Sequence, residues 1–542
     1  MRNSNKVMGL VAAAATAVAA IPSTAWGFGI EIPENGATAF GRGGAFMTRA
    51  SDPSAVMQNV AGIAGLSGFQ ITLSSNIGRF EHCFQRTGNY QGSSSGAVVD
   101  ATGTVFDPGN GSDPAYLSGN VPYPQVCNDT QVALAPMLLG TYRINRMFSL
   151  GFGVFAPSTT GAGQRFPDTV VATDSVTHMS FNAPSPVRNL LFDKNLTVLH
   201  PVIAVAVQPL RWLRFGLGIE PSFGRFQFGL HVNAISTAPQ SPSSDVRINL
   251  DASGFFMAGS LSTQVLPTSF LSFAAQFHYN FGIDASGTAN NVALPYTRAP
   301  AGNITSSFDI NSMKVNLPWT LRAGVRYNLP RAGRPTQNDG TGTYDPMSDD
   351  VFDVEAMVTY ESTSSLAETS LTNTGTIRID PSGTSVPAPR SITIRSALSD
   401  TMGFRLGGDW NIIPGVLAVR LGGAYETGGA SPSATSIHLP SYAGGTVNAG
   451  LSYRWRWLTI SAGYGHYFFQ TFDASTGQRA ITVPSSTVAD PAHPPPGVTP
   501  EGQIDPATGC TGNTRGSEAC TINRGTYTAQ MNSGSIQFTA RF

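Results

Sequence analysis

The chain has 542 residues and a formal net charge of −1, and charged residues make up 12% of it, about half the ~25% share of soluble domains. This charge balance excludes a strongly basic nucleic-acid-binding surface. The 59 glycines suit barrel interiors and tight turns.

Residues 1–27 are predicted to be a secretory signal peptide. Arg2 and Lys6 give a basic start, residues 8–20 form an apolar run, and Ala25 and Gly27 supply small side chains for cleavage. The alternative, a membrane anchor, needs about 20 apolar residues, and this run is shorter. We therefore expect an exported protein.

Residues 28–67 are rich in glycine and alanine and do not alternate. The segment is too long for a barrel turn and too short for a domain. A plug folded inside a barrel and a disordered tail are both compatible with this composition. For a plug, we expect Arg42 and Arg49 to pair with Asp353 or Glu355 on the barrel wall.

Residues 68–542 repeat a period-two pattern, which places apolar side chains on one face of a strand and polar ones on the other. Clear examples are residues 148–154, 271–280, 417–426 and 535–542. Short turns alternate with long polar loops, and Trp and Tyr gather near strand ends. A β-sandwich lacks this asymmetry. The pattern predicts an all-β fold: a transmembrane antiparallel β-barrel of about 14 strands in the bacterial outer membrane.

Four cysteines occur, and an exported protein permits disulfides. Sequence alone allows three pairings, of which local pairing, Cys83–Cys127 and Cys510–Cys520, is the simplest. Metal binding is the weaker alternative, because no CxxC or nearby histidine pattern accompanies the cysteines.

Several positions are candidates for a route through the barrel. Pro157 cannot donate to a strand ladder, and Ser158, Thr159 and Thr160 follow it as a weak strand. This stretch is either an opening in the wall or an ordinary strand end at the outer rim.

The candidate ligand contacts are apolar and cationic. Phe155, Phe226 and Phe228 occupy inward positions, unless a bulge reverses the phase and turns them to lipid. The second long loop carries apolar side chains that either line an extracellular groove or pack the loop onto the rim: Val170, Val171, Met179 and Phe181. Among the inward arginines, Arg322 and Arg405 are candidates to hold a carboxylate, although most such arginines are expected to form structural ion pairs.

The sequence does not favour an enzyme. His278 and His466 stand alone, with no GxSxG elbow and no phosphate-binding glycine loop. We expect no cofactor and no metal site.

The motifs together resemble one family, the long-chain fatty-acid outer-membrane transporters of the FadL/TodX type, over the whole mature chain. Residues 35–55 resemble the family's N-terminal hatch, with Asp52 inside the match. The family's Asn-Pro-Ala motif is represented by Asn59-Val60-Ala61, which keeps the asparagine and alanine and lacks the proline. Further matches are residues 153–157, 317–324, 404–410 and 419–425.

The resemblance implies a monomeric barrel of fourteen strands, residues 68–542, with residues 28–67 as a hatch that plugs the lumen. It also implies capture of a hydrophobic ligand such as a long-chain fatty acid at extracellular loops and lateral release near the third strand into outer-membrane lipid, beneath the lipopolysaccharide. The alternatives are a general diffusion porin, which lacks a hatch, and a structural or adhesive barrel.

Overall fold

The computed structural model describes residues 35–90, 121–130, 132–157, 164–176, 178, 180–188, 190–233, 245–293, 306–340, 342–374, 376–378, 385–387, 391–395, 398–432, 435, 437, 440–474 and 523–542. The predicted signal peptide, residues 1–27, lies outside these residues. Among the helices in the described ranges, none is both long and apolar enough to cross a bilayer.

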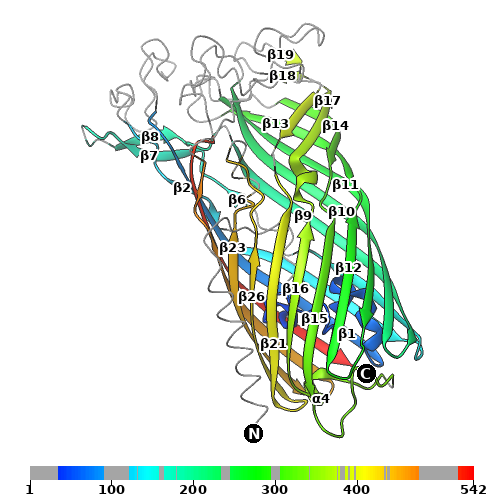
Figure 1. Ribbon diagram of the computed structural model, residues 1–542. Coiled ribbons are helices and arrows are strands. Elements are labelled where there is room, and N and C mark those ends of the chain that lie inside the picture. Colours follow the sequence, from blue (N-terminus) through cyan, green and yellow to red (C-terminus); the bar gives the residue numbers. More distant parts are fainter. Residues whose placement is uncertain are drawn as a thin grey trace.

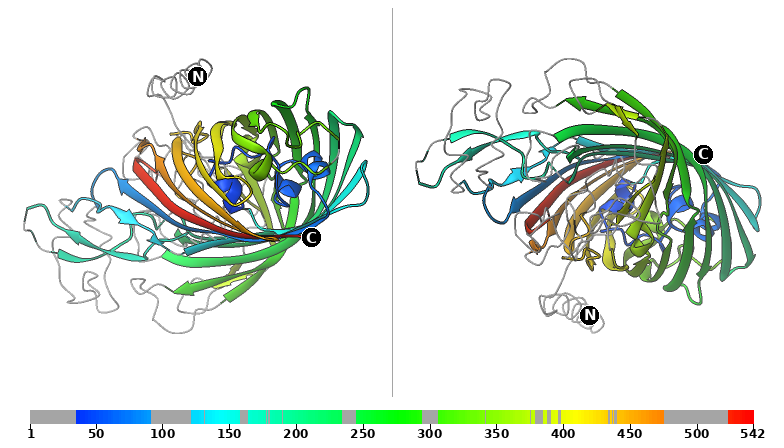
Figure 2. Two further views of the ribbon diagram at one scale, coloured as in Figure 1. Left: turned by 90° about the horizontal axis from the view of Figure 1, so that it is seen from below. Right: turned by 90° about the horizontal axis from the view of Figure 1, so that it is seen from above.

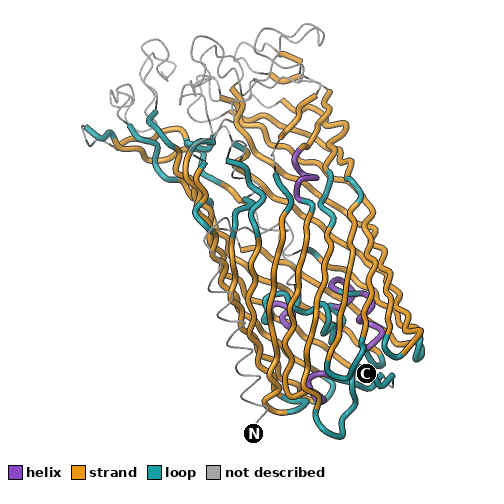
Figure 3. Tube along the Cα trace, in the orientation of Figure 1, coloured by secondary structure: helices purple, strands orange, loops and turns teal. Residues whose placement is uncertain are grey.

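The described strands form a closed antiparallel β-barrel of fourteen strands, which confirms the predicted fold class (Figures 1 and 3). A barrel strand that is interrupted partway carries two labels. In chain order the barrel strands are β1 (Phe69–Arg86), β4 (Val132–Arg143), β5 (Phe148–Phe155), β9 (Leu191–Leu210), β10 (Leu213–Asn233), β11 (Asp245–Val265), β12 (Leu271–Asn280) with β13 (Ile283–Ala293), β14 (Ser306–Val315) with β15 (Thr320–Pro330), β16 (Asp350–Glu361) with β17 (Glu368–Thr374), β20 (Ser391–Arg395) with β21 (Thr401–Ile413), β22 (Leu417–Glu426), β23 (Gly444–Trp455), β24 (Leu458–Phe469) and β26 (Gly525–Arg541).

The remaining elements are short. At the rim lie β2 (Val126–Cys127), β3 (Asp129–Thr130), β6 (Gln164–Arg165) and β25 (Phe472–Asp473), and two separate ribbons pair β7 (Thr169–Thr173) with β8 (Ser180–Pro184) and β18 (Thr376–Arg378) with β19 (Ser385–Pro387). The described helices are α2 (Ala37–Phe40), α3 (Ala55–Gln58), η1 (Val60–Gly65), α4 (Pro346–Asp349) and η4 (Thr363–Ala367).

The barrel closes because β1 pairs with β4 on one side and with β26 on the other, both antiparallel. The β1–β26 ladder runs from Gln70 opposite Arg541 to Arg86 opposite Gly525. The last strand therefore completes the wall, as the alternation of residues 535–542 requires, and the sheet closes on itself between β1 and β26.

Burial follows the predicted alternation. On β26, Ser535, Gln537 and Thr539 are buried, whereas Ile536 and Phe538 are exposed. Large aromatic side chains stay exposed near the ends of the barrel strands: Trp212, Trp410, Tyr453, Trp455, Trp457 and Phe542. An apolar outer surface with aromatic side chains near its boundaries is that of a membrane-spanning barrel of the outer-membrane type.

Two strand boundaries differ from the prediction. The alternation predicts a continuous strand from Asn316, but β15 begins at Thr320, because Pro318 has no N–H to donate and interrupts the ladder. The alternation also predicts a first strand from Phe69 to His82 with Cys83 in the loop that follows, but β1 continues to Arg86, so Cys83 lies in the strand. The barrel strands on either side of this one are interrupted next to the same point, between β12 and β13 on one side and between β16 and β17 on the other.

Cys83 and Cys127 are opposite each other in the β1–β2 ladder, and a disulfide joins them. Cys510 and Cys520 lie outside the described residues. The link fastens the long first loop to β1 at the rim, and it closes a loop whose ends are 44 residues apart in sequence.

We predict that peptide mapping of the unreduced protein will recover Cys83 linked to Cys127 and Cys510 linked to Cys520. The physical reason is proximity: both pairs are close in the chain, and the first pair is also aligned by strand register. Mass spectrometry with and without reductant checks this. Peptides that link the first pair to the second, or free thiols at these positions, would contradict it.

Residues 35–67, named here the inner segment, lie within the barrel in the half that carries the short turns (Figures 1 and 2). Helix α2 contacts β23, β24 and β26, whereas η1 contacts β5, β9, β10 and β11 on the facing wall. The inner segment therefore spans the lumen from one wall to the other, and nearly all of its residues are buried.

Candidate functional site

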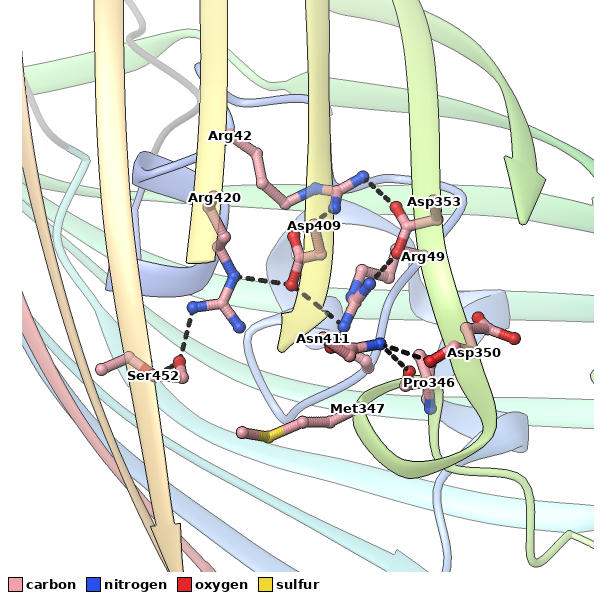
Figure 4. A network of polar contacts seen from close by, with 12 residues as sticks. Arg42, Arg49, Pro346, Met347, Asp350, Asp353, Asp409, Asn411, Arg420 and Ser452 are labelled. Atoms are coloured by element: carbon pink, nitrogen blue, oxygen red, sulfur yellow. Dashed lines mark hydrogen bonds and ion pairs between the residues drawn. The ribbon is translucent and has the colours of Figure 1, made fainter. Parts of the chain in front are cut away.

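A buried ion network fastens the inner segment to the barrel wall (Figure 4). The Arg42 guanidinium lies 2.7 Å from Asp353 and 3.5 Å from Glu355, and it also pairs with Asp409. Arg49 pairs with Asp353 and lies 3.1 Å from Asp409. The predicted pairing of Arg42 and Arg49 with lumen carboxylates is thus confirmed, and no member of the network is exposed.

Backbone groups and other residues of the inner segment add to this attachment. The amides of Thr48 and Arg49 donate to Glu355 at 2.6 and 3.0 Å. The Ala61 amide donates to Ser262 Oγ at 2.7 Å, and Asn59 Nδ2 donates to the Met47 carbonyl at 2.8 Å.

Asp52 links the inner segment to the last strand. Its carboxylate accepts hydrogen bonds from the Ser54 amide at 2.9 Å and from Gln537 Nε2 at 3.0 Å. Asp52, Asn59 and Ala61, which the sequence resemblance assigned to a hatch, therefore each hold the inner segment to itself or to the wall.

Glycines on β21 and β22 make room for this attachment. A Cβ at Gly407 or at Gly422 would overlap the backbone carbonyl group of Arg42. The Gly-Gly pairs of residues 407–408 and 422–423 are thus explained in part by the close approach of the inner segment.

Above the inner segment, buried apolar side chains pack together inside the barrel; most come from β9, β10, β11, β13, β14 and β17, and two come from η4 and from the residues just before β21. This set, named the upper apolar cluster, consists of Val198, Phe226, Ile248, Leu250, Ala252, Phe256, Ala258, Ile283, Ala285, Ala289, Phe308, Ile310, Met313, Val315, Leu366, Leu371 and Leu398. Leu196, Phe228 and Leu317 pack against it. Phe226 and Phe228 therefore face the lumen, and the β10–β11 register runs without a shift, so no bulge turns them to lipid.

Phe155 also faces the lumen, at the upper end of the short strand β5. It packs with Val56, Val60 and Ile63 of the inner segment in a second apolar cluster. Asn35 of the inner segment donates to the carbonyl of Ala156 at 2.5 Å. The end of β5 is thus in direct contact with the inner segment.

The ladder of β5 stops at this point. Phe155 is opposite Met137 of β4 and His200 of β9, and the next described pairing along this strand position is at Gln164 and Arg165 of β6. Pro157 lies two residues beyond the end of β5, as the sequence predicts for a strand terminator. Ser158, Thr159 and Thr160 lie outside the described residues.

The two candidate arginines are both buried on the lumen face. Arg405 Nη1 donates to Thr359 Oγ1 at 3.1 Å, and Nη2 lies 3.7 Å from Glu426. Its Nε and Nη2 atoms have no hydrogen-bond partner in the described part of the chain. Most other lumen arginines form the expected structural pairs, such as Arg420 with Asp409 at 2.8 Å and Arg326 with Asp350 at 2.6 Å.

The loop residues are dispersed. Val170 packs against a rim cluster that contains Phe84, Tyr442 and Tyr527, whereas Val171 on the same ribbon is exposed. Phe181 lies in β8, and Met179 falls outside the described residues. Among these four loop residues, Val170 is the one whose described side-chain contacts lie at the rim.

The expectation that His278 stands alone is wrong. Its Nε2 lies 3.1 Å from Glu220 Oε2, and the same oxygen lies 3.3 Å from His200 Nδ1. Ser222 Oγ lies 2.8 Å from His200 Nδ1. The first and last of these residues, His200 and His278, are 78 positions apart, and the set comes from β9, β10 and β12. No local sequence motif therefore predicts the cluster. We name this set the histidine cluster.

No group of three or more His, Cys, Asp or Glu side chains in the described ranges is arranged to hold a metal ion.

A polar turn closes the end of the barrel below the inner segment. The loop between β15 and β16 contains α4, and the carboxylate of Asp345 pairs with Arg454. Burial raises the pKa of Asp345, but Arg541 and Arg454 outweigh burial and hold its pKa below the ordinary range.

Solved structures with this architecture include a FadL homologue, a toluene transporter and a monoaromatic hydrocarbon channel. A FadL homologue from Pseudomonas aeruginosa aligns with 95% of this chain and 100% of its own at a TM-score of 0.63 and 14% identity. The P. putida toluene transporter TodX aligns with 96% of this chain and 99% of its own, at a TM-score of 0.54 and 12% identity. The monoaromatic hydrocarbon channel CymD aligns with 94% of this chain and 98% of its own, at a TM-score of 0.52 and 14% identity.

No family model matches the sequence. A search of curated proteins finds no match either. The likeness to the solved structures therefore shows a shared fold over nearly the whole chain, which confirms the fold that the sequence resemblance implies.

Proposed function

We propose that this protein is an outer-membrane transporter for hydrophobic compounds, with long-chain fatty acids as one ligand class. The observation that carries this proposal is the division of the lumen: the inner segment fills the lower half, and the upper apolar cluster lines the half above it. An apolar lining with few polar groups suits a hydrophobic ligand. A general diffusion porin needs a wet, open lumen, so the proposal is favoured over that alternative.

The proposed route starts at the extracellular loops and ends in the membrane. Ligand captured near the rim, where Val170 packs, enters the upper apolar cluster and contacts Phe226 and Phe228. It leaves sideways between β4 and β9, above Phe155, where the ladder of β5 ends. A hydrophobic solute gains free energy by staying out of water, which favours lipid over the aqueous periplasm as its exit.

Within this route, Arg405 is the proposed anchor for an acidic head group. A guanidinium binds a carboxylate through two parallel hydrogen bonds, and Nε and Nη2 of Arg405 are the two N–H positions that such a fork uses. Glu426 lies 3.7 Å from Nη2 and offsets part of the charge of Arg405.

We predict that Phe226→Ala will weaken binding of a neutral hydrophobic probe about tenfold or more, since a buried Phe contributes about 1.5–3 kcal/mol of apolar contact. Phe255→Ala is the matched control: Phe226 is 3% exposed in the lumen, and Phe255, on the adjacent strand, is 79% exposed on the outside. Titration of the purified barrel with labelled toluene checks this. Equal losses in the two variants, or no loss in Phe226→Ala, would count against a binding site in the upper apolar cluster.

The proposal as a whole is tested by uptake of radiolabelled oleate and toluene in cells that express the chain. Uptake above a vector control supports a transporter. Conductance of small ions without uptake of either probe would support the porin alternative.

A further inference from the structure

The histidine cluster lies where the two apolar clusters and the end of β5 meet. The His200 ring stacks on Phe155 with centroids 5.0 Å apart, and it meets the edge of Phe256 at 5.7 Å. Phe155 belongs to the cluster on the inner segment, whereas Phe256 belongs to the upper apolar cluster. His200 therefore bridges the upper apolar cluster and the end of β5.

Hydrogen bonding fixes the proton on His200. Ser222 Oγ donates its single proton to the Glu220 carbonyl oxygen at 3.0 Å. Ser222 Oγ must then accept from His200 Nδ1 at 2.8 Å, and Glu220 Oε2 accepts from the same Nδ1–H at 3.3 Å. We assign the Nδ1–H tautomer to neutral His200 on this ground.

This assignment leaves Nε2 of His200 for another partner. In the described part of the chain Nε2 has no hydrogen-bond partner, and both contacts of the imidazole ring nitrogens go through Nδ1. Nε2 accepts a hydrogen bond when the ring is neutral and donates one when it is charged. The second oxygen of Glu220, Oε1, also has no partner among the described residues, because His200 and His278 share Oε2.

The charges around the cluster come from few elements. His200 on β9, Glu220 on β10 and His278 on β12 form it, and β5 and β11 place Phe155, Phe256 and Ser260 next to them. Lys194 lies six residues from His200 along the same face of β9. On the other side, β15 and β16 add Arg322 and Glu361, whose register positions lie near that of His278.

With both imidazoles neutral, the cluster carries one negative charge and repels a carboxylate. With both protonated, it carries one positive charge and attracts one. Imidazole can carry or release a proton, so the charge of the cluster depends on the protonation state of the two rings.

We propose that His200 exchanges a proton with the head group of a hydrophobic carboxylic acid at the exit beside Phe155. The His200 imidazolium donates its Nε2 proton to the ligand carboxylate; the new O–H bond forms as the N–H bond breaks, and neutral imidazole and neutral carboxylic acid result. A hydronium ion from the solvent then returns a proton to Nε2 and leaves a water molecule, which restores the imidazolium. Glu220 is a positioning residue that holds Nδ1–H and stabilises the imidazolium.

The inference rests on the proposed transport function and narrows its ligand class. A carboxylate is poorly soluble in hydrocarbon, because an uncompensated charge is costly to bury, whereas the neutral acid partitions into it. A neutral hydrocarbon needs no such group. A proton-exchanging side chain at the exit therefore favours hydrophobic acids as ligands of this barrel.

The test compares uptake of oleate with uptake of oleyl alcohol, which has the same chain and no acidic head, between about pH 5 and about pH 8. For His200→Gln we expect oleate uptake to fall about tenfold or more, because a hydrogen bond to a charged group is lost. We also expect the pH profile of oleate uptake to flatten. Uptake of oleyl alcohol should stay near wild type. His466→Gln, on the outer face of β24, is the matched control and should leave both probes unchanged.

Glu220→Gln is the second variant, because an amide keeps a hydrogen bond to Nδ1 and removes the charge. Without that charge the imidazolium is less stable, so the pH profile of oleate uptake should move to lower pH. Heat-modifiable migration on a gel verifies that each variant folds.

The outcomes separate the two claims. Wild-type oleate uptake and an unchanged pH profile in His200→Gln, or equal losses of both probes, would overturn the role of His200. If the unmutated protein takes up oleyl alcohol but not oleate, the role of His200 is overturned, whereas the proposed transport function still stands. Uptake of neither probe by the wild type would overturn the proposed function itself.

Discussion

Sealing the wall beyond β5 should abolish uptake and leave the barrel folded. The change is Pro157→Val together with Ser158→Val, Thr159→Val and Thr160→Val, which restores a ladder donor and adds residues with high strand propensity. If ligand leaves sideways above Phe155, the extended ladder blocks its path. We expect oleate and toluene uptake to fall to the vector background, measured in the same cells.

Two controls accompany this variant. Heat-modifiable migration shows whether the barrel forms, and equilibrium binding of toluene to the purified protein shows whether the upper apolar cluster still takes up ligand. The expected combination is normal binding with lost uptake. Wild-type uptake in the sealed variant would contradict lateral exit at this position and would favour a path through the inner segment.

Removing Arg42 should release the inner segment and open the lumen. Arg42 is fully buried and contacts Asp353, Glu355 and Asp409, so Arg42→Ala leaves buried carboxylates with only part of their compensation. Breaking a buried ion pair on one side costs about 3–5 kcal/mol. That cost falls on the attachment of the inner segment, since the barrel ladders do not depend on it. We expect stable ion conductance in planar bilayers, where the wild type shows little.

Arg225→Ala is the matched control, because the Arg225–Asp251 pair is exposed to solvent and its removal should leave conductance unchanged. Gly422→Val tests the same attachment without a change of charge, since its side chain would overlap the Arg42 backbone. A folded Arg42→Ala barrel that conducts no more than the wild type would argue against a plug held by this network.

The sequence predicted the parts of this molecule that depend on nearest neighbours along the chain. Period-two alternation assigns each side chain to the lumen or the lipid, and so it placed Phe155, Phe226 and Arg405 on the inner face correctly. Opposite charge predicted that Arg42 and Arg49 of the inner segment would pair with Asp353 or Glu355, and both arginines contact Asp353. The proline at position 157 indicated the end of β5 for a local reason, the missing backbone donor.

Only the tertiary structure decided which inward side chains meet across the lumen. Strand register, the stagger of the closed barrel and strand interruptions such as that at Pro318 set the height of each residue, and none of these is encoded in a local window. His278 therefore looked isolated in sequence, although β9, β10 and β12 bring it together with Glu220 and His200. Alternation determines the face on which a residue lies, whereas closure of the barrel determines its neighbours there, because contacts between distant strands exist only once the sheet has closed.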